Sequence, residues 1–154
     1  MTTKDILKKI REDNNLTQEQ FGQRVLVTRQ AVSRWETGET EPNNETLKIL
    51  SREFNVSINT LLGSPRQLFC QCCGMPLTED ENISREEDRS FNEDYCKWCY
   101  TDGKFTYVSK DALLDFLMDH MPNPEGTADD ERRQQYDGWL SQLAYWKNKD
   151  QRKR

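Results

Sequence analysis

Residues 17–36 read TQEQFGQRVLVTRQAVSRWE and contain two short helical patterns joined by a tight turn. Thr17 suits the N-cap of the first helix, and Gln20 three residues later completes a capping box. Thr28 suits the N-cap of the second helix. In this second helix the apolar residues share one face, which ends at Trp35, and polar side chains occupy the opposite face. The pattern predicts two helices, the second with a polar face that packing does not require.

The polar face of the second helix is rich in arginine and glutamine. These side chains read guanine and adenine edges in the major groove of DNA. A helix of this kind after a tight turn is typical of a helix-turn-helix, whose second helix enters that groove. The sequence therefore predicts binding to double-stranded DNA. The candidate contact residues are Gln18, Thr28, Arg29, Gln30, Ser33 and Arg34.

Further motifs flank this pair of helices, namely residues 16–20 (LTQEQ), 33–38 (SRWETG), Pro42 and 61–63 (LLG). Through these motifs the region from about residue 3 to residue 63 resembles the Cro/C1-type (XRE) helix-turn-helix family. The resemblance implies a five-helix domain like that of the lambda repressor. It also implies base contacts from Arg29, Gln30 and Arg34, and a phosphate contact from Gln18.

One residue departs from that family's pattern. Family members usually carry glycine where this chain has Leu26, because the first helix of the motif often ends there in a left-handed conformation. Leucine in that conformation costs about 1 kcal/mol or more. Two alternatives remain open: either the turn differs in this chain, or the domain tolerates the strain.

The apolar residues of the first 63 positions recur at helical spacing and predict one small core. Arg11 falls on the solvent side of the first predicted helix. The predicted core residues are Ile6, Ile10, Leu16, Phe21, Val25, Val32, Trp35, Leu47, Leu50, Phe54, Leu61 and Leu62.

Composition favours two small domains over one large one, because only 34 % of the 154 residues are hydrophobic and 32 % are charged. Small domains often need a staple such as a metal ion. Breaks in the pattern predict four parts: a helix-turn-helix domain (1–63), a linker (64–68), a zinc ribbon with C-terminal helices (69–147) and a basic tail (148–154). The fold class expected is mainly α, with short β-hairpins in the zinc ribbon and two helices after it.

The net charge of −5 is unusual for a DNA-binding protein, but the charges are unevenly distributed. Residues 1–63 hold nine basic and nine acidic residues, whereas residues 64–154 hold thirteen and eighteen. A neutral domain with arginines gathered on one helix can bind DNA while depending less on general phosphate attraction.

The cellular compartment follows from what the sequence lacks. No apolar run approaches the roughly 18 residues of a membrane span, and residues 1–5 do not begin a signal peptide. We therefore expect a cytoplasmic protein without membrane contact. Thiols stay reduced there, so the five cysteines are better interpreted as metal ligands than as disulfides.

Two Cys-x2-Cys pairs, separated by 22 residues, have a spacing close to that of zinc ribbons. Each pair supplies two thiolates from one tight turn, and two such turns complete a tetrahedron. The predicted zinc ligands are Cys70, Cys73, Cys96 and Cys99. Cys72 is left over, and we interpret it as a free thiol beside the metal, with a redox role as the alternative.

Between and after these pairs the chain alternates between polar and apolar segments. Residues 79–94 hold eight acidic and two basic residues, and we expect a solvated, mobile connection here rather than a docking site for a basic partner. Residues 100–108 predict a hairpin with an Asp-Gly turn. The pattern from residue 127 predicts a final helix that starts with a capping box and carries an apolar stripe extending to Trp146. That stripe would cover the zinc ribbon or pack against a second subunit.

The motifs at 69–77 (FCQCCGMPL) and 93–106 (EDYCKWCYTDGKFT) resemble those of the zinc ribbon domain family. The resemblance extends over residues 68–147. It implies a fold and a bound metal, and it implies no established activity.

Together these observations predict a sequence-specific transcriptional regulator whose zinc ribbon serves interaction, dimerisation or sensing. One such helix reads few base pairs, so we expect a homodimer on half-sites about 34 Å apart. The alternative is an antitoxin-like or scaffold protein whose zinc ribbon binds a protein partner. We predict no catalytic residues and no enzyme activity, because four cysteine ligands leave no open metal position and the chain shows no nucleophile–base pair.

Overall fold

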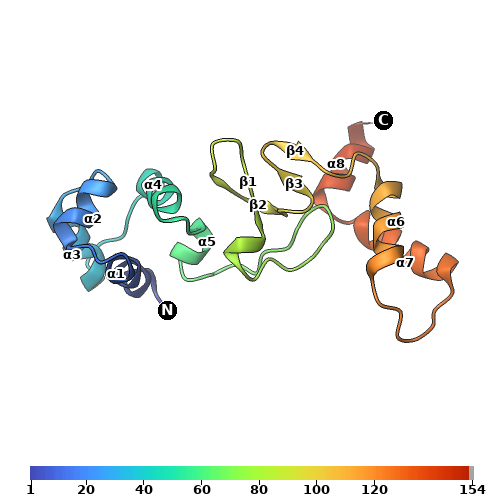
Figure 1. Ribbon diagram of the computed structural model, residues 1–154, viewed down its shortest axis with the longest axis horizontal. Helices are drawn as coiled ribbons and strands as arrows, with labels where there is room; N and C mark the ends of the chain where they lie inside the picture. The colour runs from blue at the N-terminus through green and yellow to red at the C-terminus, as the bar shows by residue number, and fades with distance from the viewer. Residues whose placement is uncertain (153–154) are drawn as a thin grey trace. The chain divides into compact units, whose positions relative to one another are not determined.

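The computed structural model describes residues 1–152, with side chains up to residue 149, and these form two compact units (Figure 1). The first is built on residues 1–67, and the second on residues 68–87 and from residue 92 onward. Helices dominate, and short strands precede the helices of the second unit, as the predicted fold class requires. In the described part of the chain, no helix has both the length and the apolar composition that crossing a membrane demands.

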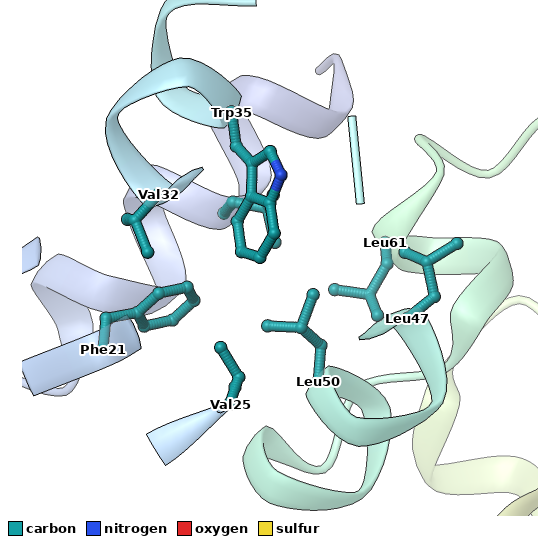
Figure 2. Close-up of a cluster of buried hydrophobic side chains, with 8 residues drawn as sticks. Phe21, Val25, Val32, Trp35, Leu47, Leu50 and Leu61 are labelled. Carbon is teal, nitrogen blue, oxygen red and sulfur yellow. The ribbon is translucent and has the colours of Figure 1, made fainter. Parts of the chain in front are cut away.

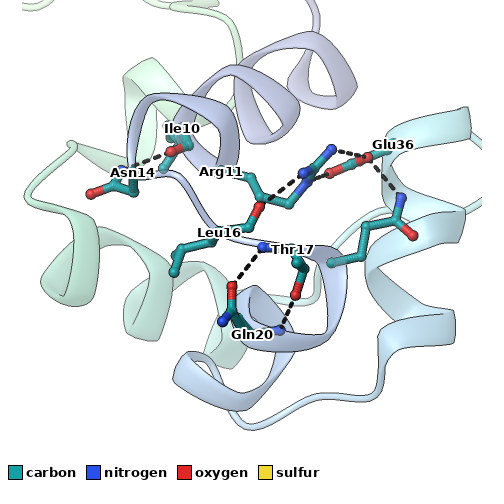
Figure 3. A network of polar contacts seen from close by, with 8 residues as sticks. Ile10, Arg11, Asn14, Leu16, Thr17, Gln20 and Glu36 are labelled. Atoms are coloured by element: carbon teal, nitrogen blue, oxygen red, sulfur yellow. Dashed lines mark hydrogen bonds and ion pairs between the residues drawn. The ribbon is translucent and has the colours of Figure 1, made fainter.

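The first unit contains the helices α1 (Thr3–Asp13), α2 (Gln18–Arg24), α3 (Arg29–Thr37), α4 (Asn44–Phe54) and α5 (Ile58–Leu61). The N-caps predicted for α2 and α3 are confirmed. Thr17 Oγ1 accepts a hydrogen bond from the Gln20 backbone at 3.1 Å, and Gln20 Oε1 accepts one from the Thr17 backbone at 2.9 Å (Figure 3). Thr28 Oγ1 accepts one from the Ala31 backbone at 3.1 Å. Helix α3 ends at Gly38, whose φ of +81° suits glycine.

The core of the first unit is formed by Leu7, Phe21, Val25, Val32, Trp35, Leu47, Leu50 and Leu61. Figure 2 shows these side chains converging from helices on both sides of the cluster. The prediction of Leu62 as a core residue is wrong, because α5 ends at Leu61 and Leu62 is 43 % exposed. Leu7, which was absent from the list of predicted core residues, is 1 % exposed.

The turn between α2 and α3 settles the two alternatives for Leu26. Its φ is +64°, so the turn keeps the left-handed geometry and the domain tolerates the strain. The backbone N–H of Val27 donates to the Gly22 carbonyl at 2.9 Å, which closes a Schellman motif. A Cβ atom on Gly22 would lie 2.7 Å from the Val27 oxygen, so only glycine fits at that position. The close approach that fixes the turn therefore depends on Gly22.

Replacing Leu26 with glycine should stabilise the first unit. Glycine removes a left-handed strain of about 1–2 kcal/mol from the folded state. Its greater backbone freedom also stabilises the unfolded state by about 0.5–1 kcal/mol. We therefore expect the free energy of unfolding to rise by about 0.5–1 kcal/mol. Little packing is lost, because Leu26 is 80 % exposed. Native-state hydrogen exchange of the buried α3 amides measures the effect. The matched control is Leu26→Ala, which removes the side chain and keeps the strain; equal stabilities for the two variants would contradict the explanation.

The strands of the second unit form two small sheets. Strand β1 (Ile83–Arg85) pairs with β2 (Phe91–Cys96), and β3 (Tyr100–Thr101) pairs with β4 (Lys104–Phe105). In the second sheet Tyr100 lies opposite Phe105, which leaves Asp102 and Gly103 as the loop. Their φ values of +50° and +83° are those of a type I′ turn, so the predicted Asp-Gly hairpin is confirmed.

The expectation of a mobile connection over residues 79–94 is wrong. This segment contains a 3-10 helix, η1 (Asp80–Asn82), followed by β1 and most of β2. Buried groups hold it in place: Ile83 is 3 % exposed, and the Ser84 hydroxyl donates to the Asn92 carbonyl at 2.9 Å. Glu86 accepts hydrogen bonds from the Asn92 side chain and the Tyr100 hydroxyl, both at 2.7 Å. One of the acidic residues of this segment, Glu86, therefore accepts hydrogen bonds that hold the fold together.

Three helices complete the described chain: α6 (Lys110–His120), α7 (Asp129–Leu140) and α8 (Ala144–Arg152). The single final helix predicted from the sequence is wrong, because the chain turns between α7 and α8. The capping box predicted at residue 127 is also wrong, since the N-cap of α7 is Ala128 and has no capping side chain. The predicted basic tail, residues 148–154, continues α8 up to Arg152, and its last two residues lie outside the described part.

Candidate metal centre and nucleic-acid interface

The predicted reading face of α3 is exposed. The side chains of Arg29, Gln30 and Arg34 face solvent, Thr28 is exposed at the N-cap, and Ser33 is half-buried. No other described residue hydrogen-bonds to, or pairs with, the side chains of the two arginines or Gln30. The opposite face of α3 packs into the core through Val32 and Trp35, which are buried. The helix therefore presents donors and acceptors that the fold itself does not use.

The ion pair between Arg11 and Glu36 (Figure 3) also holds Gln18, at the start of α2. Its side-chain amide donates to Glu36 Oε2 at 2.9 Å. Arg11 reaches the same carboxylate through Nε and Nη2, at 2.5 and 3.2 Å, and donates to the Leu16 carbonyl at 2.9 Å. The Glu36 and Arg11 side chains are only 7 % and 15 % exposed. The network fixes the amide of Gln18 beside the first turn of α2.

The position of Arg11 was not predicted. It was expected to face solvent, but it points inward to Glu36, which lies 25 residues later in the chain. Helical periodicity cannot reveal such a pair, because it relates residues of one helix only, and Arg11 and Glu36 lie on different helices.

Two opposing effects act on the Glu36 carboxyl. Burial raises its pKa, but hydrogen bonds from Arg11 and Gln18 outweigh this and hold the pKa below its ordinary value of 4.5. A carboxyl whose pKa is lower in the folded state stabilises that state above its unfolded pKa. This contribution is lost as the pH falls through the folded-state pKa.

Replacing Glu36 with glutamine should make the first unit less stable at neutral pH and less sensitive to acid. Loss of the charge leaves Arg11 half-buried without its anion, which costs about 1–3 kcal/mol. The free energy of unfolding, compared at neutral pH and below pH 4.5, tests this. The matched control is Glu39→Gln, which changes an exposed glutamate. If the Glu36 variant loses as much stability in acid as the wild type does, the network is not the acid-sensitive element.

The second unit brings the four predicted metal ligands together. The Sγ atoms of Cys70, Cys73, Cys96 and Cys99 all lie within 4.8 Å of one another. In the first turn the backbone N–H groups of Cys72 and Cys73 both donate to Cys70 Sγ at 3.4 Å. In the second turn the Cys99 N–H donates to the Cys96 carbonyl at 3.2 Å. Two tight turns therefore present their thiols to a common point.

The geometry fits a tetrahedral metal ion. Zinc–sulfur bonds of about 2.3 Å place the sulfurs of a tetrahedron about 3.8 Å apart. The Sγ atoms of Cys73 and Cys96, one from each turn, are 3.8 Å apart. Gly74 follows the first turn with φ of +80° and donates to the Cys70 carbonyl at 2.7 Å. The four cysteines are therefore placed to hold a metal ion between the two turns.

The thiols also interact electrostatically. Hydrogen bonds from Cys73, Cys96 and Cys99 hold the pKa of Cys70 far below its ordinary value, whereas hydrogen bonding to the other thiols raises the pKa of Cys99. Four thiols at this separation cannot all ionise unless a cation compensates the charge. A divalent metal ion supplies that charge and takes all four sulfurs as thiolates.

Cys72 does not belong to this group of thiols. It is fully buried, and its carbonyl accepts a hydrogen bond from Trp146 Nε1 at 2.8 Å. Through this bond helix α8 attaches directly to the first metal-binding turn. The backbone of Cys72 thus links the first metal-binding turn to the C-terminal helices.

Comparison with known families agrees with this division. Residues 69–147 match the family model described as "Putative zinc ribbon domain", and residues 7–61 match the model described as "Helix-turn-helix". The described helices α1–α5 lie largely within the second match, and the four clustered cysteines lie within the first.

Two curated proteins are similar to parts of the chain. The HTH-type transcriptional activator BcrR of Enterococcus faecalis is 44 % identical over 78 residues, which are 51 % of this chain and 35 % of that protein. Antitoxin PezA of Streptococcus pneumoniae is 32 % identical over 62 residues, which are 40 % of this chain and 39 % of that protein. The chain thus spans less than two fifths of the length of each relative.

Solved structures of the P22 c2 repressor are also similar to part of the chain. A crystal structure of that protein in complex with synthetic operator 9T is 34 % identical, covers 40 % of this chain and 94 % of the other, and has a TM-score of 0.39. An NMR structure of its DNA-binding domain is 34 % identical, covers 40 % and 82 % of the two chains, and has a TM-score of 0.38.

Proposed function

The chain belongs to the zinc ribbon domain family and carries a helix-turn-helix domain before the ribbon, and on this basis we propose that it is a sequence-specific DNA-binding transcriptional regulator. Both resemblances predicted from the sequence are therefore confirmed. One observation carries the proposal. The exposed face of α3 displays Arg29, Gln30 and Arg34 without partners in the described chain, while the other face packs into the core.

In this proposal α3 lies in the major groove and reads base edges directly. Arg29 and Arg34 donate in bidentate fashion to the O6 and N7 atoms of guanine, and Gln30 suits the N6 and N7 atoms of adenine. Thr28 at the N-cap of α3 and Ser33 within the helix add further contacts to the DNA. Gln18 holds a phosphate, and the network with Glu36 restricts its side chain before DNA arrives. A restricted side chain loses less conformational entropy on binding.

The second unit contributes a structural metal site. We propose that Cys70, Cys73, Cys96 and Cys99 hold zinc, because four thiolates in a tetrahedron are a usual structural zinc site. Such a set leaves no open position for a reacting water, so the metal supports the fold rather than a reaction. The thiols must stay reduced to bind it, and this requirement supports a cytoplasmic location.

The regulator acts as a homodimer in this proposal. A single recognition helix contacts only a few base pairs, and the N-terminal 63 residues have no net charge to strengthen general phosphate binding. Two copies on half-sites about 34 Å apart double the base contacts and supply the missing affinity. The zinc ribbon, which does not contain the reading helix, is available to join the copies or to bind a protein partner.

Selection of bound duplexes from a random pool tests the proposal. The full chain, loaded with zinc, should enrich a motif with two related half-sites separated by about one helical turn. Failure to enrich any motif, under salt conditions in which the protein is folded, would contradict sequence-specific binding.

An antitoxin-like role is the second candidate. It has the similarity to antitoxin PezA in its favour, but that match is shorter and less identical than the match to the activator BcrR. We therefore rank it below a role in transcription.

A further inference from the structure

A cavity of about 690 Å³ lies beside the cluster of metal-binding cysteines in the second unit. Its walls come from the two cysteine turns, from residues 106–107, from α6 and from α7. We call it the ribbon pocket. Its most prominent side chains are those of Trp98, Tyr107, Phe116, Met121 and Trp139. The volume falls within the roughly 300–1,000 Å³ of sites that hold small molecules.

The lining of the ribbon pocket is mainly apolar. No Asp, Glu, Lys, Arg or His in the described residues lines it. Trp98, Phe116, Met121 and Trp139 are 52, 43, 45 and 41 % exposed, so they keep much of their surface in solvent. Large apolar side chains that are exposed one at a time need no explanation, but several around one hollow mark a binding site.

The pocket is built directly on the metal-binding turn. A Cβ atom placed on Gly74 would lie 2.3 Å from Cζ2 of Trp139, so the indole of Trp139 lies against the bare backbone of that turn. Cys73, Cys96 and Cys99 also belong to the wall. The shape of the pocket therefore depends on the turns that the metal holds in place.

We propose that the ribbon pocket binds one uncharged aromatic small molecule. Aromatic and methionine side chains suit such a ligand, since rings stack or meet edge to face and methionine adapts to irregular shapes. An anion is disfavoured because no basic side chain lines the pocket. A positively charged ligand would find no carboxylate inside the pocket.

A second copy of the chain is a poorer occupant. In a two-fold dimer whose axis passes through the pocket, the two hollows would face each other and leave a larger void. Voids of that size lose the packing contacts that stabilise an interface. A small molecule fills the hollow without this loss.

Dye binding to the full zinc-loaded chain tests the proposal. N-phenyl-1-naphthylamine is an uncharged aromatic dye that fluoresces in apolar surroundings, and 8-anilinonaphthalene-1-sulfonate is the same framework with a sulfonate. The uncharged dye should bind saturably with one molecule per chain, and the sulfonate should bind more weakly. Trp98→Ala and Met121→Ala should each weaken binding about fivefold or more, because each removes a large contact. Binding should also quench tryptophan emission, because Trp98 and Trp139 line the pocket.

Phe69→Ala and Val108→Ala are the matched controls, since both residues are exposed and apolar and neither lines the pocket. They should leave dye binding unchanged. The proposal is overturned if the controls weaken binding as much as the pocket variants, or if the dye binds without quenching tryptophan in the wild-type chain. It is also overturned if sedimentation shows a self-associated chain that Trp98→Ala dissociates and that excludes the dye. None of these readouts involves DNA, so the pocket and the proposed regulatory function stand or fall separately.

Discussion

Removing the metal ion with a chelator should unfold residues 69–147 and leave the helices of residues 1–63 folded. The second unit has only two small two-stranded sheets, and four of its buried or half-buried side chains are the clustered thiols. Without a cation these thiols compete for protons at short range, and the two turns lose their common anchor. Structural zinc supplies about 10–16 kcal/mol in small zinc-dependent domains, which exceeds the stability of most domains of this size.

Hydrogen exchange followed by mass spectrometry separates the two units in this experiment. After chelation, amides of β1–β4 and α6–α8 should exchange fully, while those of α1–α5 keep their protection, and added zinc should restore the second unit. Cys96→Ser should behave like the chelated protein even with zinc present. The control is Cys72→Ala, which removes a buried thiol outside the cluster and should retain a zinc-dependent fold. Loss of protection in both units, or in neither, would contradict this prediction.

Replacing either arginine of the reading face with alanine should weaken binding to the selected duplex by about 1–3 kcal/mol, or roughly 5- to 150-fold per half-site. Arg29 and Arg34 are exposed and form no hydrogen bond or ion pair with another described side chain, so their loss should not disturb the fold. The cost therefore reports the DNA contact alone. Fluorescence anisotropy at one fixed salt concentration measures it, because salt alone changes affinity strongly.

A charge-matched control separates base reading from general electrostatics. Lys104→Ala removes one positive charge from an exposed position on β4 and should leave affinity nearly unchanged. If it weakens binding as much as Arg34→Ala does, affinity depends on total charge rather than on the reading face.

Most of the structure of the first unit could be predicted from local sequence signals. Capping residues, a glycine at a close approach and apolar spacing are all local, and they placed α2, α3 and most of the core correctly. Local signals did not decide two further features, because they placed Arg11 in solvent and left the conformation of Leu26 open between two alternatives. Arg11 pairs with Glu36 across 25 residues, and Leu26 occupies a left-handed position that the surrounding turn imposes. In both cases the tertiary structure overrides the local preference.

The second unit was predicted less completely, for a physical reason. The cysteine quartet and the Asp-Gly hairpin have short, specific spacings, and the structure brings the four thiols together. The acidic segment before the second cysteine pair was expected to be solvated because most of its residues are charged or polar. Its two buried residues, Ile83 and Ser84, are too few to change that average composition. The ribbon pocket could not be foreseen, because its walls come from segments far apart in the sequence. From sequence alone, apolar residues such as Trp139 are expected in the core, whereas in the structure Trp139 lines the ribbon pocket.

The central claim is that α3 reads DNA sequence through its exposed polar face. Repeating the duplex selection with Arg34→Ala, beside the wild-type chain, tests it most directly. We predict that the variant still enriches the two half-sites at the same spacing but loses its preference at one base pair in each. An unchanged motif with undiminished preference at every position would contradict the account.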